Sequence, residues 1–274
     1  MPLPTLTVPL RGRGRPRTQA PKIQTVLVTS DYHAPFVDWP TYHAMRHFLK
    51  DIRPDYHVIN GDAIDAFELS RFSKDPRRFG QTVEELEIFN TILDELYEAS
   101  PTTITKFIAG NHSARITNRF YDNPDLLALV SPTRDPNDVL IQALGLKQRG
   151  ISYLPYREVL DIGGFLITHG EAYGIHPSQA ELKRYGMSGV SGHCHRNTSF
   201  EMKNRRGFAK WWTIGGLCQH SMDYRPTNDW NNGIGLYEGV AGTDLFQFHQ
   251  IEIIGGRFVF QGAVYDQDGK HSAL

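Results

Sequence analysis

The sequence predicts an α/β fold whose strands end in polar residues of the kind that bind ligands. Short runs of β-branched and apolar residues alternate with longer segments in which apolar residues recur every three or four positions. The first pattern is typical of buried strands and the second of amphipathic helices. Aspartate, asparagine or histidine follows several of the predicted strands, at the carboxyl ends where α/β sheets bind their ligands.

The first half of the chain supplies three predicted strands and two predicted helices. IQTVLVTS, residues 23–30, is a β-branched run that predicts a buried strand stopping at Asp31. TVEELEIFNTILDELYEAS, residues 82–100, has the clearest helical period and an acidic outer face. A second helix is predicted over 41–52, and further strands over 55–60 and 103–109.

The second half is less regular. Residues 113–160 predict mostly helical and irregular structure, and VLDIGGFLIT over 159–168 predicts a hairpin that ends at His169. A short helix, PSQAELKRY over 177–185, leads to a strand over 187–191. Further strands are predicted over 211–218, 245–254 and 257–266, and no internal repeat is visible.

The composition is that of an ordinary globular domain. Of the 274 residues, 40% are hydrophobic and 22% are charged. No stretch approaches the length of about 18 apolar residues that crosses a membrane. The two cysteines cannot build a disulfide framework. The N-terminal apolar run precedes its positive charges, the reverse of a secretory signal. We therefore expect a cytoplasmic protein without a membrane partner, with one domain over 22–274.

A basic arm precedes this domain. Residues 1–22 hold five basic and no acidic residues, whereas the remainder holds 24 basic and 30 acidic residues. We predict a flexible tail over 1–21, because proline, glycine and arginine dominate it. Its RGRGRPRT stretch resembles an AT-hook, whose arginines enter narrow A·T minor grooves. DNA binding by Arg11, Arg13, Arg15 and Arg17 and a tail without a specific partner both stay open.

Five predicted strand ends carry residues that bind metal ions through oxygen or nitrogen. Each alone also has an ordinary interpretation as a turn, a strand terminus or a loop. Five at consecutive strand ends are difficult to reach by chance. In chain order they are Asp31 and His33, Asp62 and Asp65, Asn111 and His112, His169, and His193 and His195.

These blocks resemble the five sequence motifs of the calcineurin-like metallophosphoesterase superfamily. The blocks are DYH (31–33), GDAID (61–65), GNHS (110–113), THG (168–170) and GHCH (192–195), and they follow the family order. The resemblance implies a single domain in which two mixed β-sheets, flanked by helices, form a four-layer sandwich. It places the site at the strand ends above the sheets.

The resemblance also implies two divalent metal ions. One would be bound by Asp31, His33, Asp62 and His195, and the other by Asp62, Asn111, His169 and His193. The two histidines of GHCH would then serve different ions. Carboxylate, imidazole and amide ligands suit Mn, Fe, Zn or Ni, and no thiolate is required. Such a pair of ions clamps a phosphate and shares the hydroxide that attacks phosphorus.

His112 is a non-ligand in this scheme. It would protonate the leaving oxygen or stabilise charge on the phosphoryl group. In parts of the family the residue equivalent to Asp65 orients this histidine, although capping of a helix is an equal alternative for Asp65. Ser113 stands where the family usually has an acidic residue, which leaves the metal ligands intact but removes a charge beside them.

Other residues near the motifs have weaker assignments. Arg115, Arg119 and Arg196 follow ligand blocks, and we expect Arg115 or Arg196 to contact substrate phosphate, with surface arginines as the alternative. Cys194 is interpreted as a buried filler. His43 and His47 have the i, i+4 spacing of some metal sites but no third ligand nearby, which favours solvated helix histidines. The aromatic residues Trp211, Trp212, Tyr224 and Trp230 either stack on bases or pack in the core.

The predicted function is that of a dinuclear-metal-dependent phosphoesterase that hydrolyses phosphate esters. The basic arm favours nucleic acid as substrate, which would make the protein a phosphodiesterase or nuclease. A phosphomonoesterase acting on proteins or small molecules is the alternative. A DNA-binding module that kept the fold without catalysis is a third interpretation, which the complete ligand set disfavours. The sequence does not indicate an oligomeric state.

Overall fold

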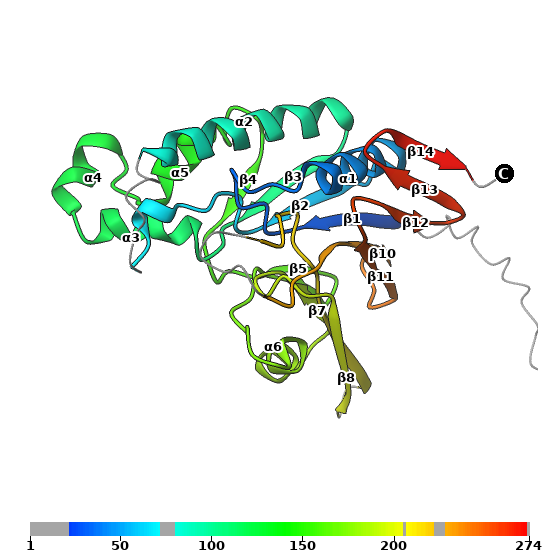
Figure 1. Cartoon of the computed structure of the whole chain (residues 1–274). Coiled ribbons are helices and arrows are strands. Elements are labelled where there is room, and N and C mark those ends of the chain that lie inside the picture. Colours follow the sequence, from blue (N-terminus) through cyan, green and yellow to red (C-terminus); the bar gives the residue numbers. More distant parts are fainter. Residues whose placement is uncertain (1–21, 72–79, 205–206, 222–227, 273–274) are drawn as a thin grey trace, which may run out of the picture.

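The chain forms four layers, with helices on the outer faces of two β-sheets that pack face to face (Figure 1). The computed structural model describes residues 22–71, 80–204, 207–221 and 228–272, so the predicted tail over 1–21 and Tyr224 lie outside it. The layers confirm the α/β sandwich of two mixed sheets.

The first sheet contains the strands that begin the chain. Its spatial order is β11 (Phe246–Ile253), β10 (Asn232–Val240), β1 (Ile23–Thr29), β2 (Tyr56–Asn60), β3 (Ile104–Ile108) and β4 (Ser152–Leu154). Strands β1 to β4 run parallel, so their carboxyl ends lie at one edge of the sheet. β10 and β11 extend the sheet in antiparallel pairing beyond β1.

The second sheet is built from the middle of the chain. Its order is β5 (Leu160–Ile162), β6 (Phe165–Ile167), β7 (Gly189–Ser191), β9 (Gly207–Thr213) and β8 (Thr198–Asn204). β6, β7 and β9 run parallel, and the antiparallel pairing of β5 with β6 confirms the predicted hairpin. A small third sheet of β12 (Phe258–Phe260), β13 (Ala263–Asp266) and β14 (Gly269–Ser272) packs beside the first.

Helices cover the outer face of each sheet. The described helices are α1 (Trp39–Ile52), α2 (Gln81–Ala99), α3 (Ser113–Tyr121), α4 (Pro124–Val130), α5 (Asn137–Ala143) and α6 (Pro177–Tyr185), with a 3-10 turn, η1 (Phe67–Leu69). α1 starts where Asp38 accepts a hydrogen bond from the backbone N–H of Thr41, and it ends at Arg53 in a left-handed conformation. α1 and α2 lie over the first sheet, and α6 lies over the second (Figure 1).

The alternation of side chains along the strands creates separate cores. In β1, Val26 and Val28 face the second sheet and pack in the cluster that holds Phe165 and Ile167 of β6. The intervening Leu27 points to the opposite face, toward α1 and α2. The ends of both sheets are thereby fixed relative to each other. No helix among the described residues is long and apolar enough to cross a membrane.

Candidate metal centre

The ligand-type residues predicted at five strand ends meet between the two sheets. β1, β2 and β3 contribute from the first sheet, and β6 and β7 contribute from the second. The seven side chains are buried or half-buried: Asp31, His33, Asp62, Asn111, His169, His193 and His195. Residues separated by up to 164 positions in the chain are therefore neighbours in the fold.

One group of donors consists of Asp31, His33 and His195, whose ligand atoms lie within 4.8 Å of one another. His195 Nε2 is 3.1 Å from Asp31 Oδ1 and 3.1 Å from His33 Nε2. His33 Nε2 is in turn 3.8 Å from Asp31 Oδ1. Two imidazole nitrogens and a carboxylate oxygen thus converge on one point.

A second group consists of Asp62, His169 and His193, again within 4.8 Å. His169 Nε2 is 3.2 Å from Asp62 Oδ2. Asn111 joins this group, because its Oδ1 is 2.8 Å from His193 Nδ1 and 3.1 Å from His169 Nε2. The division between the groups follows the two ligand sets that the resemblance implied.

Asp62 lies between the two groups. Its Oδ2 is 3.2 Å from His169 Nε2 in one group and 3.8 Å from His33 Nε2 in the other. Its Oδ1 accepts a hydrogen bond of 2.9 Å from the backbone N–H of His112. That bond fixes the rotation of the carboxylate, and Asp62 is placed to serve both groups.

Ionised carboxylates give the centre a field that stabilises positive charge. Burial raises the pKa of Asp31, but the imidazoles of His195 and His33 outweigh burial and hold this pKa well below its ordinary value. Burial lowers the pKa of His33, whereas Asp31, Asp65 and Asp62 raise it to about 10. Burial, with a contribution from His169, instead lowers the pKa of His193 to about 4, and burial also lowers the pKa of His195, so these two rings favour the neutral form that binds metal ions.

The backbone is strained at five of the seven residues. The φ angle is 56° at Asp31, 48° at His33, 46° at Asp62, 66° at His193 and 55° at His195. Residues other than glycine rarely adopt this left-handed region, and such outliers cluster at functional sites. Backbone hydrogen bonds hold the strained turns, among them one of 2.9 Å from His33 N–H to the carbonyl of Asp62.

Glycines in the motifs give these donors the space they occupy. A Cβ on Gly61 would overlap the ring of His169. A Cβ on Gly110 would overlap the carboxylate and backbone nitrogen of Asp62, and Gly192 is similarly confined by the end of β1. Larger side chains at these positions would displace a donor, which explains the glycine in the second, third and fifth motifs.

His112 borders the centre, with Nδ1 toward Asp65 and Nε2 toward the metal-binding donors. Its Nδ1 is 2.7 Å from the carbonyl oxygen of Asp65 and 3.1 Å from the Oδ1 of the same residue. Because a carbonyl oxygen only accepts, Nδ1 carries a proton, and Nε2 is the nitrogen that faces the donors. Nε2 is 3.9 Å from Asp62 Oδ2. His112 also falls within 4.8 Å of His33 and Asp62, so a ligand role competes with the proton-transfer role.

The sequence profile of the calcineurin-like phosphoesterase family matches residues 24–254. The chain belongs to this family. It is therefore a metal-dependent phosphoesterase, a hydrolase of phosphate esters.

The gene 54 protein of Mycobacterium phage L5 is 26% identical over 266 residues, which span 88% of this chain and 98% of the phage protein. The gene 54 protein of Mycobacterium phage D29 is 24% identical over 271 residues, with the same two coverages.

Solved structures of the same general shape are more distant. Vacuolar protein sorting 29 from Cryptosporidium parvum aligns with a TM-score of 0.47 and 14% identity, covering 92% of this chain and 99% of its own. A dimetal phosphatase from Danio rerio aligns with a TM-score of 0.40 and 10% identity, covering 90% and 97%. These likenesses are too remote to bear on function.

Asp65 of the phosphoesterase contacts two histidines. Its Oδ1 is 3.1 Å from His112 Nδ1 and 3.5 Å from His33 Nδ1. The short turn η1 that follows is preceded by Ala66 and has no side-chain cap. These contacts favour the orienting role for Asp65 over the capping alternative.

The arginines that follow the motifs differ in their contacts. Arg115 lies within the site, because its Nη2 is 3.0 Å from His112 Nε2 and its Nη1 donates to the carbonyl of Asp65 at 2.7 Å. Arg196 uses its guanidinium for Asp229, at 2.8 Å, and for the carbonyls of the loop at 173–174. This engagement favours a structural role for Arg196.

Aromatic residues divide between the core and the rim of the site. Trp211 is fully buried against α6 and Trp212 packs between the sheets, which is the core role. Trp230 instead lies against His195, with ring centroids 4.2 Å apart. Tyr173, which the sequence did not single out, is 79% exposed, and its ring is 6.3 Å from that of His193. Two aromatic rings therefore border the donors.

Asn60 is a further residue that the sequence did not indicate. Its carbonyl accepts a hydrogen bond of 2.8 Å from His169 Nδ1, which leaves Nε2 of that histidine for the centre. Its side-chain Nδ2 donates to the carbonyl of Thr168 at 2.8 Å and so joins the end of β2 to the end of β6. Its signal in the sequence is a single asparagine that closes an apolar run, and strands without any functional role end in the same way.

Proposed function

We propose that the phosphoesterase holds two divalent metal ions at the converging strand ends. One ion would be bound by Asp31, His33, Asp62 and His195, and the other by Asp62, Asn111, His169 and His193. The observation that carries this proposal is the position of Asp62, whose Oδ2 approaches a histidine of each group. A carboxylate has two oxygens and can bind both ions.

The donor set fits such ions. Carboxylate, imidazole and amide donors suit Mn, Fe, Zn or Ni. The Nε2 atoms of His33 and His195 lie 3.1 Å apart, so one ion can take both nitrogens as ligands in place of the hydrogen bond between them. Among the described residues, neither Cys194 nor Cys218 belongs to a group of possible metal ligands.

The chain's own residues would position the ester and move a proton. Bound metal ions would supply Lewis acidity, which activates water and neutralises charge on phosphoryl oxygens. Once Arg115 turns from Nε2 to a phosphoryl oxygen, a protonated His112 would deliver a proton from Nε2 to the leaving oxygen, while Asp65 holds Nδ1 and stabilises the protonated ring. Arg115, beside His112 Nε2, is placed to bind a phosphoryl oxygen.

The proposed substrate is a phosphodiester of nucleic acid. The exposed ring of Tyr173 and the ring of Trp230 flank the donors, and such rings stack on bases in single strands. The basic arm over 1–21 would add a sequence-independent attraction to phosphates. In this proposal the arm is a tether and residues 22–274 form the catalytic domain.

Rates on matched substrates test the proposal. Full-length protein loaded with Mn should hydrolyse bis(p-nitrophenyl) phosphate and single-stranded DNA faster than p-nitrophenyl phosphate. Excess chelator should abolish all three activities, and added Mn should restore them. Faster hydrolysis of the phosphomonoester would instead assign the protein as a phosphomonoesterase, and full activity in chelator with no bound metal would contradict the two-metal centre.

The arm is tested in the full-length chain by replacing Arg11, Arg13, Arg15 and Arg17 with glutamine. Four arginines that each neutralise a phosphate contribute about −3.6 to the slope of log affinity against log salt concentration. The variant should lose this part of the slope for DNA binding. Its rate on bis(p-nitrophenyl) phosphate should stay unchanged, because the small ester offers the arm no further phosphates. Superimposable titrations would leave the arm without a role in binding.

A further inference from the structure

A basic cavity adjoins the metal centre. It has a volume of about 320 Å³ and opens between the end of η1 and one face of α3. Arg71 lines it from the η1 side. Arg115 and Arg119, one helical turn apart, line it from α3, and Asn111 forms the part shared with the metal centre. Three guanidinium groups therefore surround one space.

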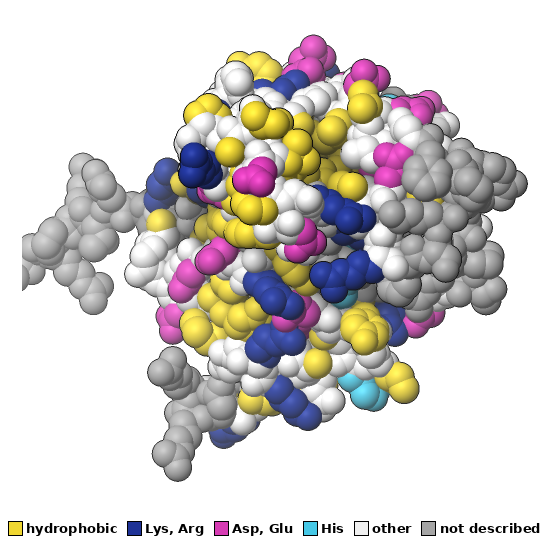
Figure 2. All heavy atoms as spheres, turned by 90° about the vertical axis from the view of Figure 1, so that its left-hand side faces the viewer, with side chains coloured by type: hydrophobic (Ala, Val, Ile, Leu, Met, Phe, Trp, Pro, Cys, Tyr) yellow, Lys and Arg dark blue, Asp and Glu magenta, His cyan; other side chains and the backbone are white. Residues whose placement is uncertain are grey.

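The described residues that line this cavity leave most of its positive charge uncompensated. Asp122 is the one acidic residue among its described lining residues, against three arginines. Arg71 and Arg119 are exposed, and their guanidinium groups make no hydrogen bond or ion pair with any other described residue. Figure 2 views the molecule from the end where Figure 1 places α3 and α4, and Lys and Arg side chains gather across this face. Unused guanidinium donors of this kind match the oxygens of a phosphate.

The cavity lies on the side of the centre where the leaving group departs. Arg115 links the two, because it lines the cavity and its Nη2 is 3.0 Å from His112 Nε2. His112 Nε2 is the atom that would protonate the leaving oxygen. A substituent of the leaving alcohol therefore extends from His112 past Arg115 toward Arg119 and Arg71.

We infer that this cavity binds a second phosphate, carried by the leaving group of the substrate. The inference rests on the proposed phosphoester hydrolysis and narrows its substrate class to esters whose leaving alcohol carries a further phosphate. A nucleic-acid strand has this character, because each nucleoside that leaves carries the next phosphate. The subsite would then select strands over isolated esters.

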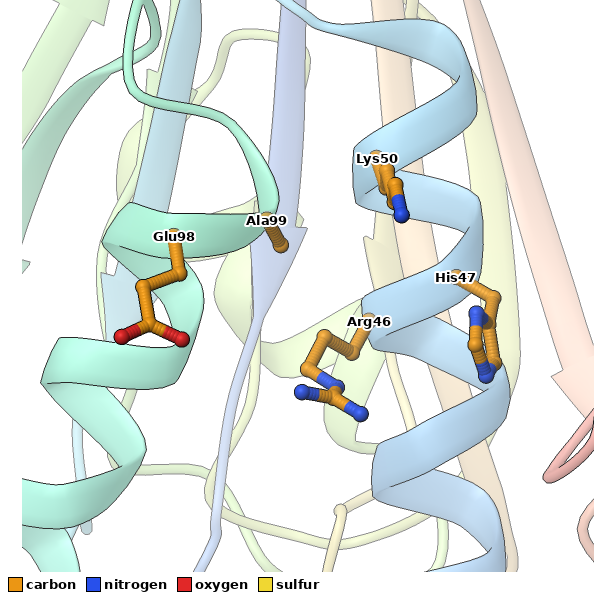
Figure 3. Close-up of a pocket in the computed structure, with 5 residues that line it drawn as sticks. All are labelled: Arg46, His47, Lys50, Glu98 and Ala99. Atoms are coloured by element: carbon orange, nitrogen blue, oxygen red, sulfur yellow. The ribbon is translucent and has the colours of Figure 1, made fainter.

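A second basic cavity in the molecule provides the control. It lies between α1 and α2 and has a volume of about 200 Å³. Arg46, His47 and Lys50 line it from α1, and Glu98 lines it from α2 (Figure 3). Its arginine is paired with Glu95, with 3.8 Å between Nη1 and Oε2, and none of the proposed metal ligands lines it. Arg46→Gln thus removes a cavity guanidinium without touching the proposed subsite.

The test compares dithymidine monophosphate with its 5′-phosphorylated and 3′-phosphorylated forms, using the full-length Mn-loaded protein. Product analysis identifies which nucleoside leaves. The form with the extra phosphate on that nucleoside should have a kcat/KM about 10–100-fold above the unphosphorylated form, the usual effect of one or two charge-assisted hydrogen bonds. Arg119→Gln and Arg71→Gln should each reduce this preference about tenfold or more, and Arg46→Gln should preserve it.

Equal rates on all three dinucleotides, or a preference that survives in both Arg119→Gln and Arg71→Gln, would overturn the subsite. Arg119→Lys should restore part of the preference, which separates charge from folding. If the protein cleaves no dinucleotide, the diester function fails, and thymidine 3′,5′-bisphosphate is compared with thymidine 5′-monophosphate. An arginine-dependent preference for the bisphosphate would retain the subsite in a phosphomonoesterase, and its absence would exclude the subsite.

Discussion

Two pairs of histidines in this molecule have spacings found in metal sites, yet their surroundings differ. His43 and His47 are one turn apart on α1, whereas His193 and His195 follow the end of β7. The strand-end pair contributes to both donor groups. The helix pair belongs to no such group among the described residues, and His47 Nε2 instead faces the carbonyl of Gln267 at 3.3 Å.

The difference between the pairs is the charge that surrounds them. On α1, burial and the neighbouring Arg46 lower the pKa of His43, and Lys50 lies one turn away from Arg46 (Figure 3). Glu95 faces this pair from α2, but its carboxylate is paired with Arg46. At the strand ends, Asp31 and Asp62 come from two other strands and supply negative charge. We therefore expect metal binding at the strand-end pair, to which the topology brings carboxylates, and none at the helix pair.

The largest expected effect comes from removing a histidine of the strand-end pair, and the same change in the helix pair is its control. Changing a hydrogen-bond partner of a metal ligand usually reduces metal affinity or activity by ~10–100-fold. His195→Ala removes a proposed ligand itself, so its loss of bound metal and of activity should be larger. His47→Ala should keep the metal content and the rate on bis(p-nitrophenyl) phosphate. Metal analysis and steady-state rates measure both. Equal losses in the two variants would show that the distinction between the pairs is wrong.

The next effect concerns the space around a donor. Gly110→Ala places a methyl group against the carboxylate of Asp62, so we expect weaker metal binding and a rate reduced by at least ~10-fold, as when a residue that supports a metal ligand is altered. Gly174→Ala is the matched control, because a Cβ at Gly174 meets no atom within 4 Å. Titration with Mn compares the two variants, and an unchanged affinity in Gly110→Ala would contradict the crowding argument.

The strand ends were predictable because their signals are local. β1 is a continuous β-branched run, and its side chains alternate between two buried faces. Polar residues directly after such runs can only lie at the carboxyl ends of strands. The motif order then supplied the proposed ligand sets, which no spacing rule provides.

β10 shows what the sequence could not indicate. Its nine residues include Gly233, Gly235 and Gly239, and glycine normally weakens a strand prediction. The structure needs them, since a Cβ on Gly235 would overlap Phe248 and one on Gly239 would overlap Tyr237. The contact with Phe248 of the neighbouring strand β11 is tertiary and invisible in a local pattern, whereas Tyr237 lies only two residues before Gly239 on the same strand. β8, β4 and β14 were missed as well, because they are short or polar edge strands.

The strand predicted over 211–218 was wrong in its position. The structure places β9 at Gly207–Thr213, and the chain leaves the sheet at the following glycines. Gly215 lies against the backbone at Asn231 and Asn232, an approach that only glycine permits. Close packing of two backbones decided where the strand ends, rather than the apolar run.

Another pair of variants separates proton transfer from metal binding. His112→Ala should retain both metal ions and lose roughly 10²–10⁴ in kcat, the usual contribution of a general acid. Asp65→Asn should cost less, about 10–100-fold, because it only weakens the orientation of His112 and His33. Metal content is measured beside kcat for each. Loss of a metal ion in His112→Ala would assign this residue to the ligands instead.

The smallest effect concerns a buried histidine that has no carboxylate partner among the described residues. His57 on β2 is 1% exposed, and its Nε2 is 2.8 Å from Thr29 Oγ1. Burial lowers the pKa of His57 from an ordinary 6.5 to about 3. His33 is equally buried, but the carboxylates around it raise the pKa of His33 to about 10. The contrast isolates the effect of carboxylates from that of burial.

The consequence is a pH-dependent stability that belongs to His57. Above pH 6.5 the ring is neutral in both states, so its contribution is complete. As the pH falls from 6.5 toward 3, the unfolded chain takes the proton first, and the free energy of unfolding falls by up to ~1.4 kcal/mol per pH unit.

Urea unfolding in chelator at pH 7.5 and 5.5 measures this pH loss, the decrease in the free energy of unfolding between the two pH values. The pH loss should be smaller for His57→Leu than for the wild type. Thr29→Val removes the hydrogen bond and keeps the ring, so its pH loss should match that of the wild type. An identical pH loss in His57→Leu and the wild type would mean that His57 is protonated in the folded protein, and burial alone would then not account for its charge state.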